Sequence, residues 1–590
     1  MAAQPKQETR FDLPGFTLPL NWKPGSSIEI FPCALDADQI DDGGYTAFLK
    51  TKREILMMRM MNTITDKPDW DKKIYNTEIT DKWTKEIVDS GADISPKMLE
   101  WIWAELKHKA ETLEENGGMV TAFNPGVVWS NTAISKGLQE DLKAAVLPLE
   151  QVPEEEKDYH PRSDQRVVDL VHPSLFPVVY GRTRILRDEI LTRDDYLSWS
   201  GKTEILPQPS DPEGMLSGTR WGHRIIKLFS TKFQWLPCDV EFEEEGCRIV
   251  SYINNLHPQK HKELYQVIEK VIAKTIPLWD ESLHEAVNEP RPRIPYDRVE
   301  YLPSDEPQPD WEEDQEGHEA WYDKQVVKQP EPQGDFQPLK QKHYKWGEQL
   351  SLRNLFREKG LQVIVKLANI ELTPDKPRYE GGTWHVEGQL NEHICATAIY
   401  YYSTENITES TLSFRTRADN YSFDDVGYEQ SRHDFLQQVY GFGPETDGYS
   451  DCPVTQDLGD VSCHEGRLLT FPNVLQHRVA PFELADKTKP GHRKILALFL
   501  VDPSIRIIST ANVPPQRADW VAERDQLRAE LLERKLPVEL QQMVLKDVDD
   551  IPITMEEAKQ YREELMEERR AVQDEQSEMF AIGNFSLCEH

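Results

Sequence analysis

Four side chains in the C-terminal half of the sequence have the types and spacing for chemistry on a metal ion. His385 and Glu387 stand two residues apart in GGTWHVEGQLNEH, His477 lies far downstream in FPNVLQHRVAPF, and Arg493 stands in PGHRKILALFLVDP. Side chains at positions i and i+2 of a β-strand point to one face, so His385 and Glu387 are expected side by side. Two histidines and one carboxylate leave the opposite face of a metal open. That arrangement suits non-haem Fe(II) and activation of O2.

Arg493 could anchor an acidic cosubstrate. Its guanidinium offers a planar pair of donors that matches a carboxylate, which a lysine would not duplicate. The residue opens an apolar strand and, by alternation, shares a face with Ile495, Ala497 and Phe499. A cation that leads into an apolar interior needs a partner. The alternative is a surface salt bridge.

Two further histidines compete for a role as ligand. His393 stands six residues after Glu387, at the start of the next expected strand, and His464 lies in SCHEG. We interpret His393 as a structural residue or an outer partner of the ligands, and His464 as the weaker rival. The structural alternative for the whole set is a pair of unrelated histidines and an exposed glutamate.

The elements that must position these residues are short strands. Residues 360–510 contain runs rich in β-branched and aromatic residues, such as LQVIVKLANIEL, HICATAIYYYS and RKILALFLVD, separated by turn residues. This pattern predicts a jelly roll or double-stranded β-helix. The full fold expectation is α+β, with this cupin-like core preceded by a helical N-terminal region and followed by a helical C-terminal tail.

The chain is too long for one simple core, and its composition shifts along its length. The segment 288–340 is rich in proline and acids, which is typical of a surface excursion. We predict five regions: a mainly helical N-terminal region (1–170), a mixed strand and helix region (171–287), an acidic linker or lid (288–340), the β-helix core (341–515) and a charged helical tail (516–590).

Composition limits the partners and the compartment. The formal net charge of −35 opposes binding to nucleic-acid phosphates, and basic residues are interspersed with acids. The seven cysteines form no CxxC pair, which fits reduced thiols. No secretory signal and no apolar run of membrane-spanning length is apparent. We expect a cytoplasmic protein, with the nucleus not excluded, that binds neither nucleic acid nor membrane.

The order of motifs in residues 361–503 resembles the catalytic core of Fe(II)/2-oxoglutarate-dependent dioxygenases, most closely the prolyl-hydroxylase-type branch. In that family a His-x-Asp/Glu motif is followed by a strand ending in aromatic residues, here HVE and CATAIYYYS. A Gly-led strand then leads to the distal histidine, here GRLLTFPNVLQH, and the last core strand starts Gly-x-Arg, here GHR. Over its whole length the chain also resembles a fungal domain-of-unknown-function family, through QWLPCDVEF, SYINNLHP and NVPPQ.

The resemblance implies a metal site and a cosubstrate site. His385, Glu387 and His477 would bind Fe(II), and Arg493 would bind the distal carboxylate of 2-oxoglutarate. Tyr401 falls where related enzymes place a hydroxyl on that carboxylate, with a packing role as the alternative. The implied reaction uses O2 to oxidise an unactivated C–H bond and releases succinate and CO2. The sequence departs from the family in its Glu ligand, in a longer spacing to the arginine and in the inserted segment 415–460.

Four functions remain open, of which one, a metal-dependent hydrolase on a jelly roll, needs no 2-oxo acid and would leave Arg493 unexplained. The first is oxidation of a small molecule, such as a natural product. We favour a small molecule over a protein as the substrate. The second is the same chemistry on a protein side chain. The third is a cupin-like binding scaffold without activity, against which the intact set of four residues argues. The C-terminal helices are a candidate surface for a homodimer.

Overall fold

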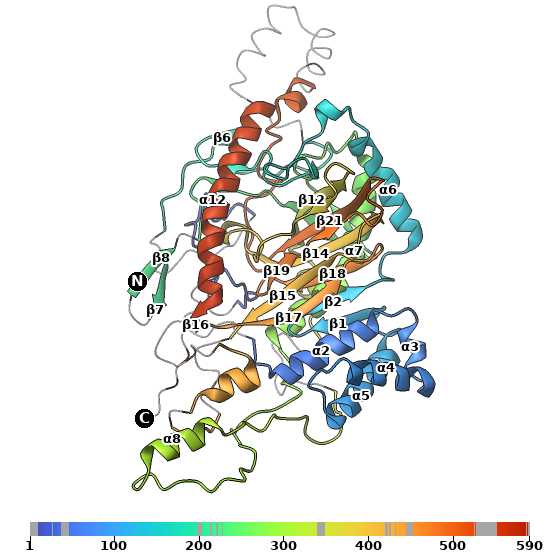
Figure 1. Ribbon diagram of the computed structural model, residues 1–590. Helices are drawn as coiled ribbons and strands as arrows, with labels where there is room; N and C mark the ends of the chain where they lie inside the picture. The colour runs from blue at the N-terminus through green and yellow to red at the C-terminus, as the bar shows by residue number, and fades with distance from the viewer. Residues whose placement is uncertain are drawn as a thin grey trace, which may run out of the picture.

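The computed structural model describes the chain from residue 10 to residue 587 with internal gaps (Figure 1). The gaps are residues 26–27, 37–46, 197–202, 213–214, 220–221, 227, 339–348, 419–422, 424–425, 431, 444–445, 447–451, 524–525, 527–551, 584 and 586. Parts of the expected C-terminal helices, of the linker and of the 415–460 insertion therefore lie outside the described residues.

A nine-stranded antiparallel sheet forms the centre of the molecule, in the order β1-β2-β18-β14-β21-β12-β10-β11, with β3 also paired to β12 (Figure 1). We call it the large sheet. Its long strands are rich in β-branched and aromatic residues, which favour extended backbone. The strand bounds are Met119–Phe123 (β1), Val127–Ser130 (β2), Val167–Val171 (β3), Cys238–Phe242 (β10), Cys247–Ile249 (β11), Leu361–Leu372 (β12), Ile394–Glu405 (β14), Leu468–Pro472 (β18) and Gly491–Val501 (β21).

A second antiparallel sheet, the small sheet, contains three strands in the order β17-β15-β19. They span Thr455–Ser462 (β17), Thr411–Arg417 (β15) and Gln476–Val479 (β19). Phe414 of β15 contacts Phe471 of β18, with ring centroids 5.1 Å apart. Residues of both sheets share one hydrophobic core. The face of the large sheet that packs on the small sheet is its inner face.

The alternation of side chains separates the two faces of the large sheet. Ile399 and Tyr401 of β14 belong to the core shared with the small sheet, whereas Ala398 and Tyr400 pack in a second core. Helices α6 (Lys136–Glu150) and α7 (Lys262–Val287) supply apolar residues to that second core. The protein is thus a mixed α/β structure built on antiparallel sheets, with helices on the outer face of the large sheet.

The N-terminal region, predicted to be mainly helical, also contains strands of the large sheet. It contains helices at Lys52–Thr65 (α2), Trp70–Lys73 (α3), Thr77–Asp89 (α4) and Pro96–Thr112 (α5), but residues 1–170 also supply β1, β2 and most of β3 to the large sheet. These strands have only four or five residues. Apolar runs of that length cannot be assigned to strand or helix by periodicity alone. The large sheet therefore crosses the expected boundaries at 170 and 340.

Helix α12 (Met555–Ala581) lies along one side of the sheets (Figure 1). Arg562 forms two hydrogen bonds with Asp158, at 2.6 and 2.9 Å. Arg569 donates to the fully buried Glu392 at 2.6 Å and stacks 3.8 Å from the Trp235 ring. The charged tail therefore docks on its own chain, and the homodimer stays a prediction.

The acidic segment after residue 288 carries helix α8 (Gln315–Asp323), which projects at the bottom of Figure 1, well away from β19. Arg432 lies over the rings of Tyr301 and Tyr322, at 4.8 and 4.5 Å, and so connects this segment to the 415–460 insertion.

The remaining elements of the described residues are short. They are Val178–Val179 (β4), Arg184–Leu186 (β5), Thr203–Ile205 (β6), Met215–Thr219 (β7), Gly222–Ile226 (β8), Phe233–Gln234 (β9), Arg378–Tyr379 (β13), Cys452–Pro453 (β16), Phe482–Glu483 (β20), Ile582–Gly583 (β22), Leu352–Leu355 (α9), Glu154–Glu156 (η1), Leu390–Glu392 (η2) and Leu436–Tyr440 (η3).

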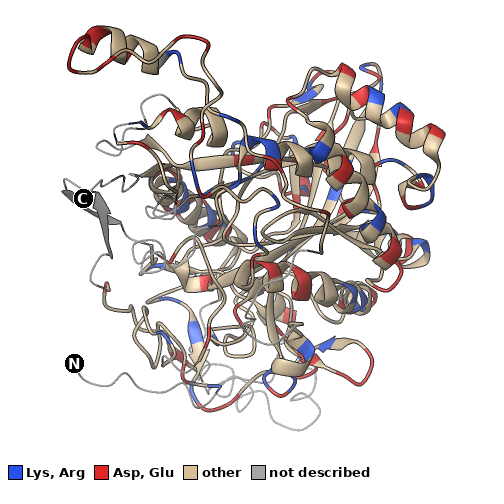
Figure 2. Cartoon of the chain, turned by 90° about the horizontal axis from the view of Figure 1, so that it is seen from below, with Lys and Arg blue, Asp and Glu red and all other residues tan. Residues whose placement is uncertain are grey.

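Charged side chains of both signs share the surface. Figure 2 shows Lys and Arg positions interspersed with Asp and Glu positions along the described helices. Among the described residues, no helix combines the length and the apolar character that crossing a bilayer requires. The expectations about nucleic acid, membrane and compartment otherwise stay predictions.

Candidate metal centre

The segment that carries His385 and Glu387 is bound to β19 by a single β-bridge rather than by the strand expected from the sequence. The His385 amide donates to the His477 carbonyl at 3.1 Å, and the His477 amide donates back at 2.9 Å. Alternation still holds locally, because Val386 packs in a separate apolar cluster. The bridge places the two imidazoles against each other, with ring centroids 4.3 Å apart.

The structure brings together the three predicted ligands. Glu387 Oε1 lies 3.8 Å from His385 Nε2 and 3.4 Å from His477 Nε2. One donor atom from each residue lies within 4.8 Å of the others. A cluster of two imidazoles and one carboxylate at this separation has the donor set and size for a transition metal.

The electrostatics of the cluster favour a cation. His385 Nδ1–H donates to the Thr383 carbonyl at 2.8 Å, which leaves the lone pair on Nε2. Burial lowers the pKa of His385 to about 4, with the charge of His477 as the next cause. Burial would raise the pKa of Glu387, but the hydrogen bond from His477 and the charges of the two imidazoles lower it to about 2. At neutral pH the cluster therefore offers an uncharged imidazole beside a carboxylate.

Aromatic packing and one buried amide hold the cluster in place. The His477 ring lies 4.6 Å from the Phe471 ring and 6.4 Å from the Phe414 ring. Asn473, directly after β18, accepts from the Glu387 amide at 2.9 Å and donates to the carbonyls of Glu387 and Ile394, both at 3.0 Å. Sequence reasoning missed Asn473, because only the fold brings it beside Glu387.

Replacing Asn473 by alanine should weaken both folding and metal binding. The change leaves the buried polar groups of Glu387 and Ile394 without partners, which costs about 1–3 kcal/mol for a single unsatisfied group. We expect a lower free energy of unfolding and, from misplacement of Glu387, a metal affinity lower by about 10–100-fold, as for outer partners of metal ligands. Urea unfolding and metal titration measure the two effects. Asn354→Ala, at an exposed position, is the control, and metal affinity equal to wild type in Asn473→Ala would contradict the assignment.

The two rival histidines lie outside this cluster. His393 has a positive φ of 44°, its carbonyl accepts from the Asp502 amide, and its buried Nε2 has no hydrogen-bond partner among the described residues. His464 Nε2 lies 3.6 Å from Asp66, which also pairs with Arg467 at 2.6 Å. Neither histidine contributes a donor atom to the described three-residue group.

His393 should make folding stability sensitive to acid. Burial, followed by the charge of Lys23, lowers its pKa from 6.5 to about 4. Between these values the unfolded chain binds a proton that the folded chain does not, so stability falls as pH falls. His393→Asn, which tolerates positive φ, should keep metal binding and remove about 2 kcal/mol of the stability lost between pH 6.5 and 5. Urea unfolding at both pH values tests this, and an unchanged pH dependence would contradict it.

Arg493 is buried at 3% exposure on the inner face. Nη1 donates to Ser410 Oγ at 2.6 Å, while Nε has no hydrogen-bond partner among the described residues. The guanidinium lies 5.0 Å from the Phe482 ring and 5.6 Å from the Tyr401 ring. No carboxylate of the described residues forms an ion pair with it. Sequence reasoning missed Ser410 as its partner.

Tyr401 is also buried, and it meets Arg493 through its ring. Burial raises the pKa of its hydroxyl well above the ordinary value, with the Cys463 thiol as the next cause. The hydroxyl hydrogen-bonds to that thiol. Tyr401 therefore packs against the guanidinium of Arg493 through its ring. This is the packing role, and it places Tyr401 beside the expected cosubstrate site.

Comparisons with known proteins identify a family. Residues 96–524 match the family described as "Protein of unknown function (DUF4246)", and residues 13–86 match the domain described as its N-terminal part. No curated protein matches the chain.

Two solved structures give distant alignments. The Fe(II)/(alpha)ketoglutarate-dependent dioxygenase TqaL aligns at 11% identity over 65% of this chain and 91% of that chain, with a TM-score of 0.20. IDO from Bacillus thuringiensis aligns at 10% identity over 25% of this chain, with a TM-score of 0.15. This chain spans only 48% of the length of that protein. Such scores carry no functional argument, so the function must be argued from the site.

Proposed function

The chain belongs to the DUF4246 family, and we propose that it is a non-haem Fe(II)- and 2-oxoglutarate-dependent dioxygenase that oxidises an unactivated C–H bond. One observation carries the proposal: the fold joins a cluster of two histidines and a glutamate to a buried arginine without a carboxylate partner among the described residues. Ser410, which binds Arg493, directly precedes β15, and β15 pairs with His477. The candidate metal ligands and Arg493 therefore lie in the same core between the two sheets.

The donor set fits Fe(II). His385 and His477 would supply Nε2, and Glu387 would supply a carboxylate oxygen, which leaves further metal positions open. Loss of the proton from His385 costs little at neutral pH, because its pKa is already lowered to about 4. His477 lacks the outer hydrogen-bond partner that usually fixes a metal-binding histidine, since its Nδ1 has none among the described residues. Packing on Phe471 fixes the ring instead.

The surroundings of Arg493 fit a bound dicarboxylic acid. Among the described residues the buried guanidinium has one hydroxyl partner and no carboxylate, so its charge is electrostatically uncompensated. A carboxylate that accepts two parallel hydrogen bonds from it would supply that compensation. The rings of Phe482 and Tyr401 lie against the guanidinium, at 5.0 and 5.6 Å. Arg493 would thus hold the distal carboxylate of 2-oxoglutarate.

The finer fold that goes with this function is a double-stranded β-helix. In support, the large and small sheets share one core and the three candidate ligands lie on the small-sheet side of it. Strands β14, β15, β17, β18, β19 and β21 follow one another in the chain and alternate between the two sheets in the pattern large, small, small, large, small, large. This connectivity between two facing sheets supports the proposal of a jelly-roll core.

When bound, Fe(II) with 2-oxoglutarate and O2 would supply the oxidising power, and succinate and CO2 would be the coproducts. The residues of this chain orient and shield the reacting groups. Arg493 fixes the cosubstrate at one end, and Asn473 fixes the backbone of the Glu387 ligand. The side chains of His477, Glu387 and His385 are 3%, 16% and 25% exposed. Such a recessed site favours a small molecule as substrate.

Anaerobic titration tests the proposal. Purified protein should be loaded with Fe(II) under argon and titrated with 2-oxoglutarate. A weak visible charge-transfer band should appear and saturate at one equivalent per chain, and succinate substituted for 2-oxoglutarate should give none. Absence of the band in folded protein that has bound iron would refute the dioxygenase assignment.

A further inference from the structure

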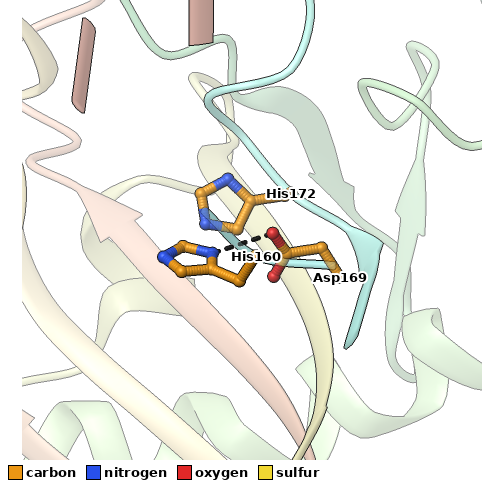
Figure 3. Close-up of side chains that lie close together, drawn as sticks. All are labelled: His160, Asp169 and His172. Atoms are coloured by element: carbon orange, nitrogen blue, oxygen red, sulfur yellow. Dashed lines mark hydrogen bonds and ion pairs between the residues drawn. The ribbon is translucent and has the colours of Figure 1, made fainter. Parts of the chain in front are cut away.

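A second polar cluster borders the large sheet. His160, Asp169 and His172 face one another, with His160 Nδ1 2.8 Å from Asp169 Oδ2 and the two imidazole ring centroids 5.1 Å apart (Figure 3). Asp169 and His172 are buried. The three residues offer donor atoms within 4.8 Å of one another, as in the first cluster.

Two contacts oppose a metal at this second cluster. The Ser174 amide donates to His172 Nδ1 at 3.2 Å, so the proton of the neutral imidazole resides on Nε2, the nitrogen a metal would need. Burial lowers the pKa of His172 well below its ordinary value, which keeps the ring neutral. In addition, Arg562 Nη1 lies 3.7 Å from Asp169 Oδ2 and already supplies a positive charge. The cluster is therefore a hydrogen-bonded structural group rather than a metal site. We call His160, Asp169 and His172 together the wall, because they border the inner face of the large sheet.

Strand register places Asp169 of this wall on the same face as Arg493. Directly paired residues of antiparallel strands have side chains on one face of the sheet. Asp169 pairs with Ala368 of β12, and Ile370 pairs with Arg493 of β21. Lys366, two positions before Ala368, pairs with Ala497 and shares the inner face. Lys366 lies about 13 Å along the strand from the level of Arg493, at 3.3 Å per residue.

Lys366 is a half-buried cation that lacks a fixed partner. It forms no hydrogen bond and no ion pair with any described residue, although Asp169 lies on the same face. Asp169 is already occupied by His160 and lies close to Arg562. The small side chain of Ala497 stands opposite Lys366 on β21.

The charge of Lys366 acts on both clusters. It is among the causes that lower the pKa of Asp169 and His172 on one side, and those of His385 and Glu387 on the other. Strand register gives the geometry independently: Ile364, two positions before Lys366 on the inner face, is level with Phe499, Thr397 and Phe471 across the large sheet, and the Phe471 ring lies 4.6 Å from the His477 ring. A cation in a partly desolvated interior is stabilised by an anion that it can bind.

We propose that Lys366 anchors a carboxylate of the substrate on the inner face of the large sheet, between the candidate metal centre and the wall formed by His160, Asp169 and His172. The inference rests on the proposed function, because it assigns the substrate to the class of organic acids. A monoanion suits the site better than a phosphate dianion, since the single positive charge of Lys366 stands near the negative charges of Asp169 and Glu387.

Matched probes test this assignment. Protein loaded with Fe(II) and 2-oxoglutarate under argon would be titrated with 3-phenylpropanoate, 3-phenylpropanamide and 3-phenylpropyl phosphate, and binding followed by ligand-observed NMR. The acid should bind about tenfold or more tightly than the amide, as expected for a partly buried charge pair, and more tightly than the phosphate. Lys366→Met should abolish the preference for acid over amide. Lys366→Arg should preserve the preference for acid over amide. That result would also show that the fold tolerates a substitution at this position.

Lys274→Met is the control for net charge, because Lys274 is exposed on α7, on the other side of the large sheet. It should bind all three probes like wild type. Equal binding of acid and amide, or a preference that survives in Lys366→Met, would overturn the proposal. Tighter binding of the phosphate would overturn the choice of a carboxylate. A second equivalent of bound metal that disappears in His172→Ala would instead make the wall a metal site.

The two proposals fail in different ways. If wild-type protein gives no charge-transfer band with 2-oxoglutarate, the dioxygenase assignment fails, while the acid and amide probes in metal-free protein still test Lys366. If Lys366→Met loses that band, Lys366 holds the cosubstrate and its assignment to the substrate is wrong. If the band persists and the acid preference disappears, both proposals stand.

Discussion

Replacing His477 by alanine should abolish turnover and remove most of the iron that the protein binds. His477 is one of the three residues whose donor atoms lie within 4.8 Å of one another, and its Nε2 lies 3.4 Å from Glu387. Loss of an outer partner of a metal ligand typically costs about 10–100-fold in affinity, so loss of a ligand should exceed that range. Metal content per chain after dialysis and 2-oxoglutarate-dependent O2 consumption measure the two effects.

The control for this variant is His393→Asn. His393 is the nearest rival in the sequence, yet it contributes no donor atom to the cluster. It should therefore retain iron and turnover. Circular dichroism must show that both variants are folded, because the buried His477 ring packs on Phe471. Equal loss of iron in the two variants would show that the ligand assignment is wrong.

The spacing of residues in the sequence predicted that His385 and Glu387 lie together, but it did not predict the elements around them. His385 and Glu387 stand two positions apart, and this spacing brings them together even though the segment forms one isolated bridge instead of a strand. Alternation also predicted that Ala497 and Phe499 would share a face, and the structure packs both in the core between the sheets. Periodicity reports local geometry, which tolerates the loss of regular strand pairing.

What the sequence could not supply were contacts between distant segments. Asn473 supports Glu387, Ser410 binds Arg493, and Lys366 joins the inner face only because β12 pairs with β21 in one register. Polar residues of these types are common on surfaces, so their type alone carries no signal. The short strands β1 and β2 were missed for a related reason, since only tertiary pairing makes them strands: β2 pairs with β18, and β1 pairs with β2.

Arg493→Lys should weaken the apparent affinity for 2-oxoglutarate while iron binding stays close to wild type. A lysine keeps the positive charge but cannot form two parallel hydrogen bonds to a carboxylate or stack as a plane between the rings of Phe482 and Tyr401. Arg493→Met removes the charge and should weaken 2-oxoglutarate binding by about 2–5 kcal/mol, the range for truncating a buried charge pair. Titrating the charge-transfer band with 2-oxoglutarate measures both variants.

The stability of Arg493→Met separates a binding role from a structural one. Because no described carboxylate pairs with the buried guanidinium, the free protein carries its desolvation cost without full compensation. Methionine fills similar space without that cost, so the unliganded variant should unfold at the same or a higher urea concentration than wild type. Lys494→Met is the control on the next residue, where the ammonium pairs with Glu150 at 2.7 Å, and it should leave 2-oxoglutarate binding unchanged. A strongly destabilised Arg493→Met with unaltered affinity for 2-oxoglutarate would make Arg493 a structural residue and place the cosubstrate elsewhere.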